Sequence, residues 1–144
     1  MIKEYIKNGN IKEAVKLLGH QYSISGKVIT GKNIGTNVVK IPTANLRVHE
    51  EKIIPGNGVY FTKVIVEKKR YYGLMNVGIR PTFNGKDRSI EVHVMDFDKN
   101  IYEQDITCHV LDKIRDEKYF DSVEGLRKQI IQDISIARKL KNRL

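Results

Sequence analysis

A series of short β-type segments separated by turns constrains the fold of this chain more than any other feature of its sequence. Residues 58–66 and 70–77 are rich in β-branched and aromatic residues, and the charged residues 67–69 between them indicate a hairpin turn. Short strands at this spacing favour an antiparallel barrel over a parallel sheet. Further strands are expected at residues 22–30, 89–95 and 106–111, a loop or short strand at 48–55, and irregular chain at 78–88.

Residues 1–21 are expected to form a helical, linker-like segment that precedes the barrel. The Asn-Gly pair at 8–9 should break this segment into two short helices. Asn10 is a suitable N-cap for the second helix, with Glu13 at capping-box spacing, and Gly19 suits the position just after its end.

A long helix is expected over residues 122–143, with either Asp121 or Ser122 as its cap. Its apolar residues recur every three or four positions and form one stripe that would pack against the barrel. The sequence therefore predicts a mostly β domain over residues 22–144 that ends in this helix.

The charge and the single cysteine narrow the range of functions. The net charge is +9, but acidic residues concentrate in 91–121 and the bases elsewhere are spread without a dense tract. A polyanionic small ligand such as ATP explains part of this surplus as well as RNA would, so nucleic acid is not the expected partner.

No apolar run is long enough for a membrane span. The single cysteine, Cys108, excludes an internal disulfide, fits a reducing cytoplasm and is typical of a small core residue.

Residues 26–45 read as a strand, then a glycine-punctuated loop, then a stiff corner at Pro42. Gly31 and Gly35 allow close approach of the backbone to a ligand, and loop N–H groups suit phosphate oxygens. Thr43 and Asn45 present oxygen atoms from the corner, the kind of ligand that Mg²⁺ requires. A loop without a ligand is the more common meaning of these signals taken alone.

The strand at 89–95 carries two polar candidates on one face. Ile90 and Val92 should point into the barrel, so Glu91 and His93 should point away from it. From the residues alone, Glu91 is either an exposed strand carboxylate, the more common case, or a general base.

Five stretches of the chain, taken together, resemble the riboflavin kinase family, including the kinase module of bacterial bifunctional FAD synthetases. The resemblance runs over roughly residues 19–140, and its most specific parts are the PTAN stretch and the glutamate of the SIEVH strand. The stretches are PTAN (42–45), PGNGVYF (55–61), NVGIRPTF (76–83), SIEVHVMDFD (89–98) and IRDEKYFDS (114–122).

The resemblance implies a six-stranded antiparallel Greek-key barrel and the reaction of riboflavin with ATP to give FMN and ADP. It implies that Glu91 is the catalytic general base and that Mg²⁺, bound with ATP, is held by Thr43 and Asn45. His93 would either orient Glu91 or face solvent. The nucleotide site implied by the resemblance and the loop comprises Gly31, Lys32, Gly35, Asn37, Lys40, Pro42, Thr43, Asn45 and Asn76.

The resemblance also implies a mobile flap over the flavin at residues 116–120. The flavin-binding residues would be Arg115, Glu117, Tyr119 and Phe120, with Arg115 approaching either the flavin or a phosphate. The two aromatic residues would pack on the flavin ring or merely pin the last helix to the barrel.

The sequence departs from the family pattern at two loop positions. Lys40 stands where family members commonly have Gly, and Asn37 where many have Lys or Arg. These departures motivate an alternative function, a flavin- and nucleotide-binding regulatory module with weak or lost kinase activity. The segment 1–21 is similar to the helical link between the two modules of bifunctional FAD synthetases, so a missing N-terminal FAD synthetase module is a further expectation.

Overall fold

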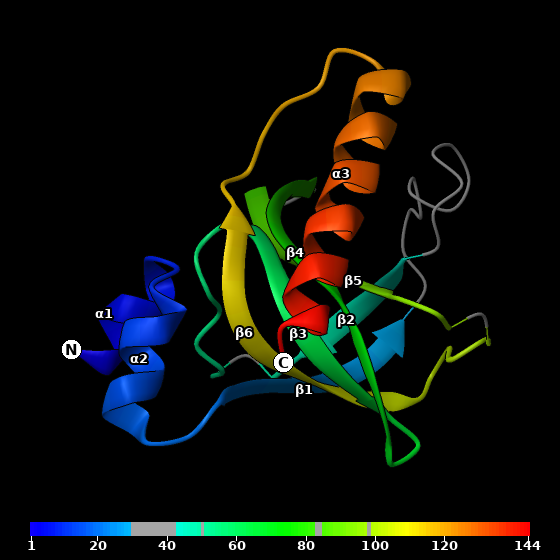
Figure 1. Ribbon diagram of the computed structural model, residues 1–144. Helices are drawn as coiled ribbons and strands as arrows, with labels where there is room; N and C mark the ends of the chain where they lie inside the picture. The colour runs from blue at the N-terminus through cyan, green and yellow to red at the C-terminus, as the bar shows by residue number, and fades with distance from the viewer. Residues whose placement is uncertain (30–42, 50, 83–84, 98) are drawn as a thin grey trace.

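Six antiparallel strands close into a barrel. The computed structural model describes residues 1–29, 43–49, 51–82, 85–97 and 99–144, with the side chains of 80–82 and 85–87 left out of the description. Around the barrel the strands follow the order β1-β2-β5-β4-β3-β6, so each strand pairs with a neighbour on both sides (Figure 1). The strands are β1 (Tyr22–Ile29), β2 (Ala44–Val48), β3 (Gly58–Val66), β4 (Lys69–Thr82), β5 (Gly85–Val94) and β6 (Asp105–Arg115).

The connections give the barrel a Greek-key topology. Strands β3, β4 and β5 follow one another as neighbours, and β6 then returns to lie beside β3. The expected mostly β, six-stranded antiparallel Greek-key barrel is therefore confirmed.

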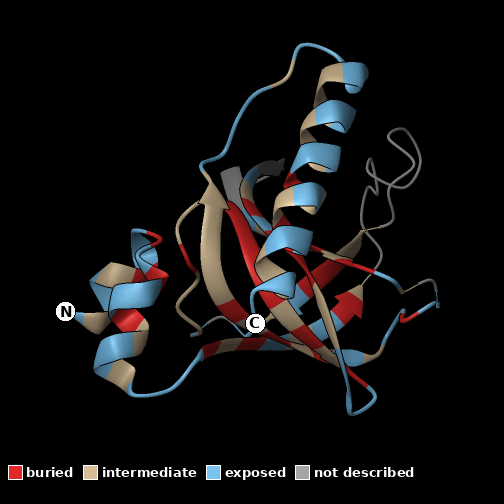
Figure 2. Cartoon of the chain, viewed as in Figure 1, coloured by how far each residue is buried: buried red, intermediate tan, exposed pale blue. Residues whose placement is uncertain are grey.

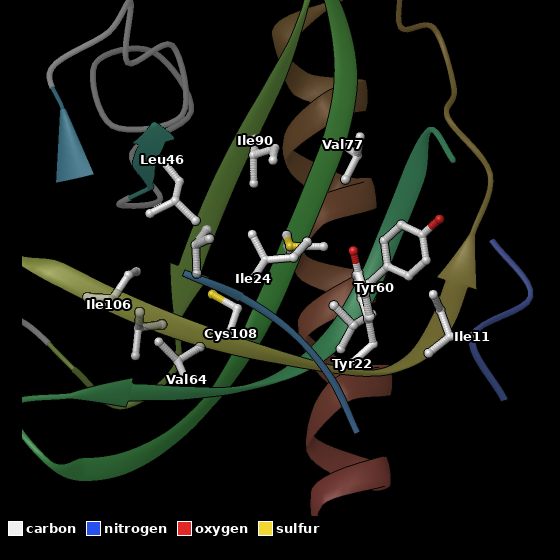
Figure 3. Packing of buried hydrophobic residues seen from close by; sticks show 14 of the residues in the cluster. Ile11, Tyr22, Ile24, Leu46, Tyr60, Val64, Val77, Ile90, Ile106 and Cys108 are labelled. Carbon is white, nitrogen blue, oxygen red and sulfur yellow. The ribbon is translucent and has the colours of Figure 1, made fainter. Parts of the chain in front are cut away.

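Side-chain alternation along the strands fills the barrel interior. Ile24, Val64 and Cys108 are fully buried and point into the same core (Figure 3). Burial raises the pKa of the Cys108 thiol to about 12, so it stays protonated at neutral pH. The expectation that Cys108 is a small core residue is confirmed.

Several expected strand boundaries differ from the structure. Strand β6, expected at 106–111, runs from Asp105 to Arg115. Strand β2, Ala44–Val48, was not expected, whereas the described residues after Val48 in the stretch 48–55 form the expected loop. Strands β4 and β5 pair from Gly73↔Val94 to Thr82↔Gly85, so most of the stretch expected to be irregular, 78–88, is a long hairpin. Gly and Pro residues there suggested a break, but continuous cross-strand pairing overrides such local preferences.

The turn between β3 and β4 is one residue shorter than expected. Lys69 already pairs with Val66, so only Glu67 and Lys68 form the turn. Both have positive φ, 50° and 68°, the backbone conformation of a two-residue turn that matches the twist of a hairpin.

Two short helices precede the barrel as expected, α1 (Ile2–Lys7) and α2 (Ile11–Leu18). Gly19 ends α2 in the left-handed conformation, at φ 80°. Asn10 stands at the N-cap but makes no side-chain cap hydrogen bond, so the expected capping box is absent. Its ψ of 67° lies outside the extended conformation that aims a capping side chain at the helix N–H groups.

The helix pair α1–α2 packs against the barrel. Ile6, Ile11 and Ala14 are at most 2% exposed and join the core cluster that fills the barrel. The Gly56 N–H donates to the Ile6 carbonyl at 3.1 Å, which ties α1 to the β2–β3 connection.

The last helix, α3 (Val123–Asn142), lies along the outer face of the barrel. Of the two expected caps, Ser122 is the one used, because its Oγ accepts from the Gly125 N–H at 3.1 Å. Ala137 packs with Val59 and Phe61 of β3, and exposed residues dominate the side of α3 that faces away from the barrel (Figure 2). No helix among the described residues is long and apolar enough to cross a membrane.

Candidate active site

A row of side chains crosses the outer face of the sheet from β2 to β6. Asn45 pairs with Glu91, Glu91 with Asn76, Asn76 with Val59, and Val59 with Arg115. Residues directly opposite in antiparallel strands project to the same face, about 5 Å from their neighbours. The barrel therefore aligns five residues that lie far apart in the sequence.

A pocket of about 190 Å³ lies over this row, between the sheet and α3. Its middle is apolar, with walls from both the sheet and the helix. Polar residues lie to either side along the row. The pocket is lined by Thr43, Val59, Leu74, Asn76, Glu91, His93, Arg115, Leu126, Ile130 and Asp133.

Glu91 lies in this pocket because of the alternation along β5. Ile90 and Val92 are buried in the barrel at 6% and 1% exposure, and Glu91 between them is half-buried on the opposite face. His93, paired with Leu74, lines the same pocket. The expected orientation of this strand is confirmed, whereas the chemical roles of Glu91 and His93 stay predictions.

The structure brings one part of the expected nucleotide and metal site to Glu91. Thr43 lines the pocket, and Asn45 is only 7% exposed and lies directly beside Glu91 in the register. Asn76 flanks Glu91 on the other side. The other expected residues lie outside the described part of the chain: Gly31, Lys32, Gly35, Asn37, Lys40 and Pro42.

Among the described residues, no three His, Cys, Asp or Glu side chains are grouped to hold a metal ion. The expected ligands, Thr43 and Asn45, do not belong to those residue types. Their oxygens suit a hard cation that also binds phosphate oxygens and water.

An ion pair between β6 and α3 lines the pocket at the Arg115 end of the row. Arg115 Nε and Nη2 donate to the two carboxylate oxygens of Asp133, each at 2.9 Å. Gln129 Nε2 donates to Asp133 Oδ1, also at 2.9 Å. Asp133 is 2% exposed and Arg115 19%, so the pair is largely removed from water.

Sequence analysis missed Asp133, although the sequence carries a signal for it. Asp133 lies three residues after Ile130 and four before Ala137, within the apolar stripe of the helix. A lone acid in such a stripe is buried when the stripe packs, and a buried acid requires a cationic partner.

The remaining expected flavin residues do not line the pocket. The Glu117 carboxylate lies beside Gly78 of β4, and Tyr119 is 96% exposed. Phe120 lies beside Arg115, with its ring centre 6.0 Å from the guanidinium carbon. Tyr119 therefore does not pin α3 to the barrel in this structure, and the flavin roles of these residues stay predictions.

The segment 116–120, which joins β6 to α3, is held at its start. Lys113 pairs with Asp116 at 2.5 Å, and this hydrogen bond lowers the pKa of the Asp116 carboxyl. Beyond Asp116 the chain arches away from the barrel before α3 begins (Figure 1). Residues 117–119 are exposed, so the segment has room to change position.

Comparison with known proteins decides the family. The family model named Flavokinase, described as riboflavin kinase, matches residues 18–141. The chain belongs to the riboflavin kinase family.

Curated relatives include proteins with one or two named activities. The bifunctional riboflavin kinase/FMN adenylyltransferase of Haemophilus influenzae is 39% identical over 98% of this chain, which covers 46% of that protein. The RNA-binding riboflavin kinase RibR of Bacillus subtilis is 39% identical over 81% of this chain and 50% of its own length. The chain thus spans about half the length of these relatives.

Solved structures share the fold. A Streptococcus pneumoniae structure, named as a macrolide-efflux protein, superposes with a TM-score of 0.88 at 36% identity and covers 95% of this chain and 45% of that one. The riboflavin kinase of Trypanosoma brucei superposes with a TM-score of 0.57 at 21% identity, over 82% of this chain and 78% of its own. The Trypanosoma likeness supports the riboflavin kinase barrel as a fold.

Proposed function

We propose that this chain transfers the terminal phosphoryl group of Mg-ATP to the 5′-hydroxyl of riboflavin, giving FMN and ADP. The observation that carries the proposal is the position of Glu91, between Asn45 and Asn76 in the row beneath the pocket. The family match supports the choice of substrates.

Glu91 is proposed as the general base. A primary alcohol is a weak nucleophile, and a carboxylate within reach accepts its proton as the new O–P bond forms. The half-buried position of Glu91 at the wall of the pocket supports this role. A role in the barrel core is excluded, because the core side of the strand is occupied by Ile90 and Val92.

Thr43 and Asn45 are proposed to hold the Mg²⁺ that enters with ATP. They fit this role because Asn45 is nearly buried next to Glu91 and Thr43 opens into the same pocket. When bound, the ion neutralises phosphate charge. The chain's own contribution is to hold two short oxygen ligands at the start of β2, beside the proposed base.

The apolar middle of the pocket is proposed to receive the flavin ring. Val59 and Leu74 form one wall from the sheet, and Leu126 and Ile130 form the facing wall from α3. Flat aromatic ligands bind in clefts of this kind, with a few polar groups at the ends to fix their orientation. Segment 116–120 is proposed as the flap, with Glu117, Tyr119 and Phe120 closing over the ring.

The other functional classes receive less support. The regulatory alternative was motivated by Asn37 and Lys40, which lie outside the described residues, and no described residue favours it. Nucleic acid is not proposed as a partner, because the bases are spread without a dense tract. An FMN adenylyltransferase module is proposed as the consumer of FMN, since relatives combine both activities. The proposed location is the cytoplasm, which the single buried cysteine fits.

A coupled assay tests the proposal. The purified chain is incubated with riboflavin and Mg-ATP, ADP release is followed continuously, and FMN is identified by chromatography. FMN and ADP should form in equal amounts. ADP release that does not depend on riboflavin, or no FMN at all from correctly folded protein, would overturn the assignment.

A further inference from the structure

Asp133 is a buried acid in the pocket to which the proposed reaction assigns no role. A buried carboxylate is strongly unfavourable unless charged and polar partners satisfy it. Here both oxygens are satisfied, by Arg115 and by Gln129. Burying this ion pair costs desolvation free energy, so the pair is expected to serve a function at Arg115.

The donors of Arg115 are only partly used. A guanidinium group has five N–H donors. Nε and Nη2 bind Asp133, and Nη1 donates to the Asp116 carbonyl at 3.1 Å. Counting bonds to described residues, one N–H remains on Nη1 and one on Nη2. Arg115 also lines the pocket, so these two donors are available to a ligand there.

A β-bulge explains why Arg115 faces the pocket. Tyr60 pairs with Lys113 and Val59 with Arg115, which leaves Ile114 as an extra residue in β6. Ile114 packs with the apolar cluster beneath α3, and Arg115, the next residue, reaches Asp133 on the same helix. Bulges commonly re-aim side chains beside active sites in this way.

We infer that Asp133 is a positioning residue that neutralises Arg115 and directs its remaining N–H groups to an uncharged acceptor, the carbonyl edge of the flavin ring. The inference rests on the proposed function. An isolated guanidinium selects anions such as phosphate. Beside Asp133 the net charge of the pair is zero, and an incoming phosphate would meet a carboxylate within hydrogen-bond distance of the arginine.

The location of the pair supports a ring contact over a phosphate contact. Along the row of paired residues, Val59 lies between Arg115 and Asn76, and Asn76 lies next to Glu91. The base, and with it the reacting phosphate, is therefore separated from Arg115 by the apolar middle of the pocket. A ring lying over Val59 would bring its polar edge to the arginine.

The test uses lumiflavin, which is the flavin ring without its ribityl chain, and measures binding by quenching of flavin fluorescence without ATP. The first variant is Asp133→Asn, which keeps the shape but leaves the arginine charge uncompensated. The second is the double variant Arg115→Met/Asp133→Leu, which replaces a buried ion pair with apolar residues and is expected to fold. The matched control is Arg138→Met/Asp96→Asn, which removes an exposed ion pair between Arg138 on the same helix and Asp96, just after β5.

Both pocket variants should lower the affinity for lumiflavin and for riboflavin by the same factor. That factor should be about tenfold to a hundredfold, as expected for hydrogen bonds from a charged group. Mg-ATP affinity should not change. In Asp133→Asn, inorganic phosphate should compete with lumiflavin, whereas wild type should be insensitive to it. The control should bind lumiflavin as wild type does.

Two results would overturn the inference. One is unchanged lumiflavin binding in the folded double variant, which would make the pair merely structural. The other is a loss of affinity for Mg-ATP alone, which would make Arg115 a phosphate ligand. Because lumiflavin binding requires no turnover, wild-type binding without FMN formation would count against the proposed kinase activity alone.

Discussion

At the scale of single residues, the chemistry proposed here depends first on Glu91. We expect Glu91→Gln to lower turnover by about 10²–10⁴-fold, because the amide keeps the size of the side chain but cannot accept a proton. Riboflavin and Mg-ATP should still bind. Single-turnover rates and thermal midpoints measured on the same preparations check this, with Glu4→Gln on the exposed face of α1 as control. Normal single-turnover chemistry would remove Glu91 from the mechanism and make His93 the next candidate.

The proposed metal ligands lead to a second prediction at this scale. Thr43→Val and Asn45→Leu should each lower turnover by about 100-fold or more, since even residues that only support metal ligands typically cost 10–100-fold when changed. Thr43→Ser and Asn45→Asp, which keep an oxygen, should retain more activity and respond to added Mg²⁺. Activity is titrated against Mg²⁺ at fixed ATP. A Thr43→Val or Asn45→Leu enzyme with a near-normal rate at ordinary Mg²⁺ would contradict the assignment.

At the scale of elements, the helix pair α1–α2 is expected to contribute to barrel stability. Ile6→Ala should reduce the free energy of unfolding by about 2–5 kcal/mol, because it leaves a cavity in the core that the pair shares with the barrel. Leu17→Ala on the same pair, at 50% exposure, should change it by less than about 0.5 kcal/mol. Urea unfolding measures both. Equal stability of the two variants, or separate unfolding of the pair, would favour a linker that is independent of the barrel.

The segment 116–120 gives a second prediction at this scale. Its backbone N–H groups should exchange with solvent more slowly when flavin and nucleotide are both bound, because the proposed flap then packs on the ligands. Hydrogen–deuterium exchange followed by mass spectrometry measures this. The remote β3–β4 turn at Glu67 and Lys68 serves as internal control. The same exchange in this segment with and without ligands would show that it is not a lid.

Elements whose signals are local were predicted well, and those that depend on distant partners were not. The break between α1 and α2, the β3–β4 hairpin and the alternation at Glu91 all follow from near neighbours in the sequence. The long β4–β5 hairpin was missed because its Gly and Pro residues signal a turn when cross-strand pairing is not visible. The Arg115–Asp133 pair was missed for a related reason: a bulge in one element aims a side chain at another.

At the scale of the whole molecule, the barrel brings motifs that are far apart in the sequence close together in space. Motifs that begin at residues 42, 55, 76, 89 and 114 lie on five different strands or strand ends, and closure of the sheet brings their residues into one row beneath α3. In the proposed reaction, the Asn45–Glu91 end of this row takes part in phosphoryl transfer, and the apolar middle and the Arg115 end receive the neutral ring. The site therefore exists only when the barrel is closed and α3 is docked.

We expect the reaction proposed for the matched kinase region to stop at FMN. The family model that matches residues 18–141 is described as riboflavin kinase, whereas the bifunctional relatives name a second activity and are about twice as long. Adenylyl transfer to FMN needs its own nucleotide site, and among the described residues one pocket accounts for the proposed kinase chemistry. We therefore expect FMN with Mg-ATP to give no FAD, measured by chromatography over times in which riboflavin is fully converted. A full-length bifunctional relative serves as positive control. FAD formed at a rate comparable with that of FMN would mean that the barrel, rather than a separate module, performs both transfers.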